Sequence, residues 1–290
     1  MIKTASSLLT TFVFGAVLAA SAPAYAQTSP TTLCINEGAT TNRSIADLQK
    51  QYEPLAKLIS SVSSKSSVTV KPFVSVGLFE DEIKTGLCDY VFGKTIDSLA
   101  RAIESDKYNV VVKDKNPYVA GIIVAKGKDF KTPKDLVGRD ILVPPSDTFT
   151  AQLLKSYLKS SGMPMTVKDT LDTFPTKEAN AVTVRHIKWQ EAVSSTVGMG
   201  WYSFGAVNPT LLKDWESKGG RVLVKMPPQP GWSILVKKDI SPKSVNALKD
   251  ALLTAAESED GKSVLKAVKL EGMVVAQNAE YLSVLKYLAH

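Results

Sequence analysis

Residues 86–93 read Gly-Leu-Cys-Asp-Tyr-Val-Phe-Gly. From Asp89 onward the pattern predicts a short buried strand that ends on Gly93. Helices are expected on both sides of it, over about 77–86 and 98–105. Strands that alternate with helices are typical of a parallel sheet, so this stretch predicts an α/β fold of the doubly wound type.

The same alternation extends in both directions from this stretch. Further strands are expected at 33–35, 68–73, 108–113, 118–125, 139–143, 198–202, 221–225 and 233–237. Further helices are expected at 45–60, 132–136, 149–160, 184–196, 209–218 and 241–256, and two short helices follow. The sequence contains no internal repeat, so the whole chain is expected to be one α/β protein with room for two modest domains.

The first residues have the pattern of a secretory signal. Lys3 precedes an apolar run from Leu8 to Ala20, and Ala24-Tyr25-Ala26 places small residues where a signal peptidase cleaves. Residues 1–26 are therefore expected to be a signal peptide that sends the protein to a bacterial periplasm. An N-terminal anchor helix is the alternative, but the run is short for a membrane span, so no stable membrane insertion is expected after cleavage.

Charge, cysteine and histidine content indicate which partners, disulfides and metal sites are expected. The net charge is +7, but the lysines are spread along the chain, which does not favour a nucleic-acid partner. The cysteines are Cys34 and Cys88, and in an oxidising compartment they are expected to form one disulfide, with two buried free thiols as the alternative. The histidines are His186 and His290, and no metal-ligand spacing is present, so no metal site is expected.

Several segments resemble one known family. They are Tyr52-Glu53-Pro54-Leu55-Ala56, residues 86–93, residues 131–139 (Lys-Thr-Pro-Lys-Asp-Leu-Val-Gly-Arg), and Pro227-Pro228-Gln229-Pro230-Gly231 followed by residues 234–239. In this order and spacing they resemble the substrate-binding component of bacterial ABC uptake transporters for phosphate, phosphite and phosphonate. These proteins are type II two-lobed periplasmic binding proteins.

The resemblance implies two doubly wound α/β lobes joined by two crossing strands. Lobe I is expected to comprise 27–113 plus 227–290, and lobe II 114–226. The implied function is capture of a small molecule in the interlobe cleft by hinge closure and delivery to an inner-membrane ABC permease. The protein is expected to be a monomer without cofactor or catalytic residues.

Candidate ligand-binding residues follow the expected strand ends or match ligand-contacting positions of relatives. They are Asn36, Glu37, Thr40, Lys94, Thr95, Tyr118, Ser146, Asp147, Thr148, Arg185, His186, Trp201, Tyr202 and Trp232. In this architecture Cys34 and Cys88 are expected on neighbouring parallel strands of lobe I, at the end opposite the ligand.

The chain departs from its phosphonate-binding relatives at two places. Where those relatives carry Ser-Thr-Ser, this chain has Asp147, Thr148 and Phe149, and Asp147 either repels an anion or caps the following helix. Trp232 replaces an acidic residue that binds the ammonium group of the ligand in relatives. A phosphonate-like ligand remains possible, but a diverged organic ligand with aromatic or cationic character is expected.

Two alternative functions stay open on the sequence alone. The protein could present its ligand to a periplasmic sensor or redox enzyme rather than to a permease. It could also be an enzyme, although the sequence has no nucleophile–base motif to support that hypothesis.

Overall fold

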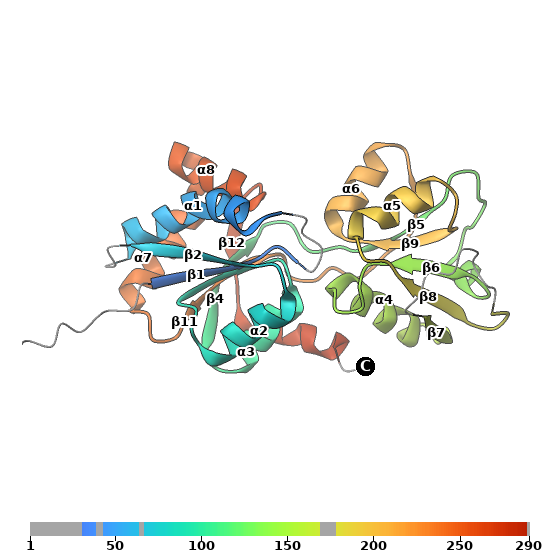
Figure 1. Ribbon diagram of the computed structural model, residues 1–290, viewed down its shortest axis with the longest axis horizontal. Coiled ribbons are helices and arrows are strands. Elements are labelled where there is room, and N and C mark those ends of the chain that lie inside the picture. The colour runs from blue at the N-terminus through green and yellow to red at the C-terminus, as the bar shows by residue number, and fades with distance from the viewer. Residues whose placement is uncertain (1–30, 39–42, 64–66, 169–177, 289–290) are drawn as a thin grey trace, which may run out of the picture.

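The computed structural model describes residues 31–38, 43–63, 67–168 and 178–288. These residues form two α/β lobes that lie side by side and are joined by two crossing segments (Figure 1). Each lobe is built on one six-stranded sheet with helices on both faces. The predicted two-lobed fold is therefore confirmed. The predicted signal peptide and Thr40 lie outside the described residues.

Lobe I contains the sheet with the strand order β12-β4-β11-β3-β1-β2. Its strands are β1 (Thr31–Asn36), β2 (Val68–Phe73), β3 (Tyr90–Gly93), β4 (Tyr108–Asp114), β11 (Ser233–Lys237) and β12 (Met273–Val275). One face is covered by α1 (Ile45–Val62), α7 (Pro242–Leu253) and α8 (Glu259–Val268), together with the short η2 (Ala255–Glu257). The other face is covered by α2 (Val76–Thr85), α3 (Ile96–Glu104), α9 (Asn278–Leu282) and η3 (Ser283–Tyr287).

Lobe II contains the sheet with the strand order β10-β5-β9-β6-β8-β7. Its strands are β5 (Gly121–Val124), β6 (Asp140–Val143), β7 (Met165–Lys168), β8 (Val182–His186), β9 (Phe204–Val207) and β10 (Arg221–Lys225). Its helices are α5 (Gln190–Gly198) and α6 (Pro209–Ser217), which pack together on the sheet, α4 (Phe149–Ser160), and the short η1 (Pro133–Leu136).

The sheets are mixed, so the prediction of a parallel sheet is wrong. In lobe I, β11 is antiparallel to both β3 and β4, and in lobe II, β5 is antiparallel to β9. The two crossings explain this difference. A strand that enters a lobe from the crossing starts at the edge where its parallel neighbours end, and it must run in the opposite direction.

The prediction also failed locally around residue 190. The expected helix over 184–196 is the strand β8 followed by a helix that begins only at Gln190, and the expected strand over 198–202 is a helix end and a turn. Residues 182–185 are buried on both sides, as in a central strand, and such a run has no one-sided pattern. The strands β7 and β12 were not predicted.

The crossing segments pair through their backbones between the lobes. The Tyr118 N–H donates to Gln229 O at 2.9 Å, and the Gln229 N–H donates to Tyr118 O at 3.0 Å. One apolar cluster runs past this pair from Phe79 in lobe I to Leu153 in lobe II. The lobes are therefore in contact through a shared core beside the crossing.

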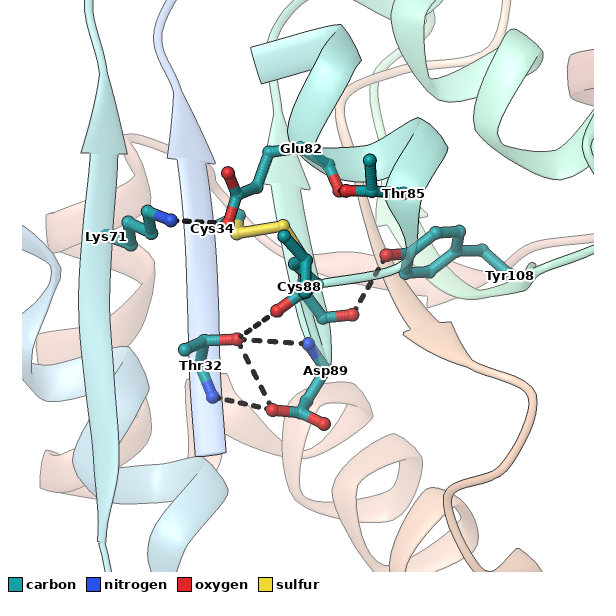
Figure 2. Close-up of polar contacts among 9 residues, drawn as sticks. Thr32, Cys34, Lys71, Glu82, Thr85, Cys88, Asp89 and Tyr108 are labelled. Carbon is teal, nitrogen blue, oxygen red and sulfur yellow. Dashed lines mark hydrogen bonds and ion pairs between the residues drawn. A yellow bond between two sulfur atoms is a disulfide. The ribbon is translucent and has the colours of Figure 1, made fainter. Parts of the chain in front are cut away.

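The predicted disulfide between Cys34 and Cys88 is confirmed. Cys34 lies in β1 and Cys88 lies just before its parallel neighbour β3, and both are fully buried. Figure 2 shows how polar contacts surround the bridge. The Thr32 N–H donates to Asp89 Oδ2 at 2.8 Å, and the Tyr108 hydroxyl donates to Cys88 O at 2.9 Å.

Removing the bridge is expected to destabilise the protein. Cys34 and Cys88 are 54 residues apart, and a bridge over such a loop restricts the unfolded chain enough to contribute about 2–4 kcal/mol. Urea unfolding of the double variant Cys34→Ala/Cys88→Ala should show this loss, and reduced wild-type protein is the matched control. An unchanged unfolding midpoint in both samples would contradict the prediction.

Candidate functional site

A cavity of about 480 Å³ lies between the two lobes. Both lobes and the first crossing contribute to it, which is the usual position of a ligand site in open α/β sheets. Its lining residues are Glu37, Gly38, Arg43, Lys94, Tyr118, Thr148, Phe149, Thr150, Gln190, Glu191, Asn208, Thr210, Leu211, Trp232 and Lys269.

The helices of lobe II that begin at this cavity include α4 and α6. Thr148 is the N-cap of α4 and accepts a hydrogen bond from the Ala151 N–H at 3.4 Å, and Asn208 is the N-cap of α6 and accepts from the Leu211 N–H at 2.9 Å. Each helix follows a strand that ends at the same edge of the sheet, β6 and β9 respectively. The positive ends of two helix dipoles therefore converge on the cavity and favour an anion there.

The lobe I wall is built around Glu37, which follows β1. Glu37 Oε1 accepts hydrogen bonds from the Tyr52 hydroxyl at 2.5 Å and from Lys94 Nζ at 3.3 Å. Burial acts to raise the pKa of Glu37, but Lys94 and the Tyr52 hydroxyl outweigh it, so that pKa lies below its ordinary value. Glu37 is thus an ionised carboxylate whose charge is already compensated within the protein.

Lys94 is the buried cation of this wall. Burial lowers its pKa to about 8, while the nearby Glu37 carboxylate opposes that shift. The Lys94 ammonium also lies over the Trp232 ring, 4.5 Å from the ring centroid. The Lys94 side chain is therefore held between an acid and an aromatic face.

The remaining charges of the cavity are predominantly positive. Arg43 and Lys269 are exposed cations on its rim, and Glu191 is the acid opposite them. Because Glu37 and Lys94 balance each other, the site carries a net positive charge before any ligand enters. Together with the helix ends, this arrangement is suited to binding an anion.

The cavity brings together some of the predicted site residues. They are Glu37, Lys94, Tyr118, Thr148 and Trp232. Asn36 and Thr95 lie buried behind this wall, where the Thr95 hydroxyl lies 3.4 Å from Asn36 Oδ1. They support the strand ends without lining the cavity.

Other predicted residues lie elsewhere. Ser146 and Asp147 are exposed and do not line the cavity, and the helix cap proposed for Asp147 is Thr148 itself. Trp201 is 68% exposed and precedes β9, at the end of that strand remote from the cavity. Tyr202 is buried in the core of lobe II.

The predicted ligand contact of Arg185 is not what the structure shows. Arg185 lies within β8 and is fully buried, and its Nε donates to Asp140 Oδ2 at 2.7 Å. His186 is the last residue of the same strand, and its Nδ1 lies 2.7 Å from Pro144 O. It is not among the residues that line the cavity. Both faces of β8 are covered, so Arg185 is buried whichever face it points to.

Several cavity residues were not predicted. They are Gly38, Arg43, Phe149, Thr150, Gln190, Glu191, Asn208, Thr210, Leu211 and Lys269. Asn208-Pro209 is a helix-start signal that follows a strand, and it would have located part of the site had β9 been placed correctly. Lys269 ends α8 and reaches the cavity only through tertiary packing, so no local pattern reveals it.

A further contact between the lobes involves a buried acid. Asp97 on α3 is 2% exposed, and its Oδ2 accepts a hydrogen bond from Gln152 Nε2 on α4 at 3.1 Å. Burial raises the pKa of Asp97 to about 6, and the nearby Glu80 carboxylate adds to this shift. The sequence analysis missed this residue.

Among the described residues, no three His, Cys, Asp or Glu side chains gather as a metal site would require. Within the same part of the chain, no helix combines the length and apolar character needed to cross a membrane.

Several solved structures have a similar fold. XAC2383 from Xanthomonas citri bound to ATP superposes with a TM-score of 0.73 at 13% identity, over 90% of this chain and 99% of that one. PhnD1 from Prochlorococcus marinus in complex with methylphosphonate gives 0.67 at 13% identity, over 89% and 97%. A binding protein of a phosphonate ABC transporter from Pseudomonas aeruginosa gives 0.62 at 13% identity, over 90% and 86%.

At 13% identity these similarities show the fold alone, and they agree with the two-lobed α/β architecture. The family model for the periplasmic phosphonate substrate-binding proteins of ABC transporters matches residues 38–281, so the chain belongs to this family. The family binds small molecules in the periplasm and works with an ABC permease; it is a family of transporter binding proteins, not enzymes. No curated protein sequence matches the chain significantly.

Replacement of Arg185 is expected to affect stability and not ligand contact. Arg185→Met would leave Asp140 buried without its ion-pair partner, at a cost of about 3–5 kcal/mol. Urea unfolding should show this loss, and the double variant Arg185→Met/Asp140→Leu should recover most of it. A variant of normal stability with impaired ligand binding would instead support a direct contact.

Asp97 is expected to make stability depend on pH. The folded chain holds the Asp97 proton up to about pH 6, whereas the unfolded chain releases it at about pH 4. The contribution of Asp97 to the free energy of unfolding therefore falls as pH rises from about 4 to 6, by at most about 3 kcal/mol, and is constant above that range.

The comparison with Asp97→Asn isolates this contribution, because the other titrating groups are common to both proteins. Urea unfolding at pH 4, 5, 6 and 7 should show the variant gaining stability relative to wild type as pH rises. Parallel pH profiles for the two proteins would rule out a raised pKa at Asp97.

Proposed function

We propose that this protein captures a small organic anion in the interlobe cavity by hinge closure and delivers it to its ABC permease. The observation that carries the proposal is the convergence of the α4 and α6 N-termini with Arg43 and Lys269 on one cavity. Each of these features favours negative charge, and they come from both lobes, so an anion would hold the lobes together.

The sequence predicts a ligand of aromatic or cationic character, and we keep the aromatic character in this proposal. Trp232 and Tyr118 line the cavity and offer apolar surface to the rest of the ligand. A cationic ligand is disfavoured, because Glu37 is compensated by Lys94 and the other lining acid, Glu191, is outnumbered by Arg43 and Lys269. The ligands of the similar structures named above, methylphosphonate and ATP, are also anions.

We further propose how the protein is exported and that it acts as a monomer. Residues 1–26 serve as the signal peptide, and the mature chain acts as a monomer in the periplasm. The family membership supports the location, and the charge pattern at the N-terminus supports the signal.

Anion binding is testable by thermal unfolding of the mature protein with methylphosphonate, phenylphosphonate, benzoate and choline. A ligand at 100 times its dissociation constant adds about 2.7 kcal/mol, which raises the melting temperature by a few degrees. The phosphonates are expected to stabilise the protein, and choline is expected to have no effect. Stabilisation by choline alone would overturn the proposal.

A matched pair of charge variants sharpens this test. Lys269→Gln removes a rim cation and should weaken phosphonate binding about fivefold, a loss of about 1 kcal/mol. Glu191→Gln removes the opposing acid and should strengthen it or leave it unchanged. Equal effects of the two variants, measured by calorimetric titration, would contradict an electrostatic role for the rim.

A further inference from the structure

A second cavity adjoins the first one on the side of the crossing segments. Its volume is about 380 Å³, and the residues that line both cavities are Tyr118, Thr210, Trp232 and Lys269. Residues that line two cavities lie between them. The Trp232 ring is the largest of these side chains, so it forms the main partition between the two spaces.

The Trp232 side chain is held in this position from two sides. The backbone carbonyl oxygen of Trp232 accepts a hydrogen bond from the Asp114 N–H at 2.7 Å, which fixes the Trp232 backbone against the end of β4. The Lys94 ammonium lies against the ring face. The partition is therefore a preorganised element of the site rather than a loose surface side chain.

The indole N–H of Trp232 is buried, and no acceptor for it exists among the described residues. A buried donor without an acceptor is unfavourable, so a ligand with an atom that accepts this hydrogen bond would bind more tightly. Tryptophan carries a donor only, so the matching ligand atom must be an acceptor, such as a carboxylate, amide or hydroxyl oxygen.

The second cavity is polar and is suited to such a group. Lys213 and Lys269 contribute cations to it, and Asn116 contributes an amide. The cavity also contains two acids. Glu271 is paired with Lys213, with Oε1 and Nζ 3.2 Å apart, and Asp114 Oδ1 accepts a hydrogen bond from the Asn116 N–H at 2.9 Å. Lys269 is then the lining cation that can meet a ligand oxygen. An oxygen-rich group therefore fits this compartment better than an apolar one.

We infer that the ligand has two parts, an anionic head in the first cavity and an oxygen-bearing extension that passes Trp232 into the second. Trp232 acts as a specificity-determining residue: its N–H binds an acceptor on the extension, and its ring limits the width of the passage. This inference rests on the proposed function, since the anionic head is what places the extension.

The test compares ligands that share one head. Methylphosphonate carries the head alone, butylphosphonate adds an apolar extension, and 4-phosphonobutanoate adds an extension that ends in acceptor oxygens. Calorimetric titration of the wild type should give at least tenfold tighter binding for 4-phosphonobutanoate than for butylphosphonate.

Two variants locate the effect at Trp232. Trp232→Phe keeps an aromatic ring but lacks the N–H, and it should reduce the advantage of 4-phosphonobutanoate over butylphosphonate about fivefold. Trp232→Ala also opens the partition and should admit branched phosphonates that the wild type rejects. Melting temperatures near that of the wild type confirm that the variants are folded.

The possible results distinguish failure of the two-part ligand from failure of the proposed function. Binding of methylphosphonate with no gain from 4-phosphonobutanoate, or a gain that Trp232→Phe leaves intact, overturns the two-part ligand and leaves the proposed function standing. Failure of every phosphonate to bind the wild type overturns the proposed function and this inference with it.

Discussion

The joint between the lobes depends on Tyr118. Its backbone pairs with Gln229 of the second crossing, and its hydroxyl lies 2.6 Å from Thr150 Oγ1 at the start of α4. Its ring packs against Phe149 with the ring centroids 5.4 Å apart, and the whole side chain is buried. One residue thus ties both crossings to the helix whose N-terminus faces the cavity. The contacts of Tyr118 therefore fix the position of α4, and with it the electrostatic field of the α4 N-terminus in the cavity.

The cavity is selective for negative charge because its one buried ion pair is neutral as a pair, whereas its other cations remain available to a ligand. Glu37 and Lys94 are covered by Tyr52 and Trp232, so their charges act on each other and fix the lobe I wall. The cations on the rim and the helix ends face the cavity instead. The proposed anion would therefore meet a positive environment that is formed before binding and needs little rearrangement.

The sequence was informative where function follows local position. Glu37 and Lys94 closely follow expected strand ends of lobe I, and Thr148 precedes an expected helix of lobe II, so these three positions at the carboxyl ends of strands line the cavity. Arg185 was misjudged because the strand β8 was missed, and a central strand buries the side chains on both of its faces. Lys269 could not be predicted from the sequence, since only the packing of α8 against the rest of lobe I brings it to the cavity. The antiparallel strands had the same origin: no local pattern reports from which side a strand enters its sheet.

The insertion of β11 between β3 and β4 has a consequence for how the molecule is assembled during synthesis. The lobe II sheet is contiguous in the chain, so all of its strands are available once β10 has been made. The β4 strand, in contrast, pairs only with β11 and β12, which are made after the whole of lobe II. The nascent lobe I therefore exposes an incomplete sheet while its partner folds, and this interval is when the chain is most open to aggregation or to capture by a chaperone.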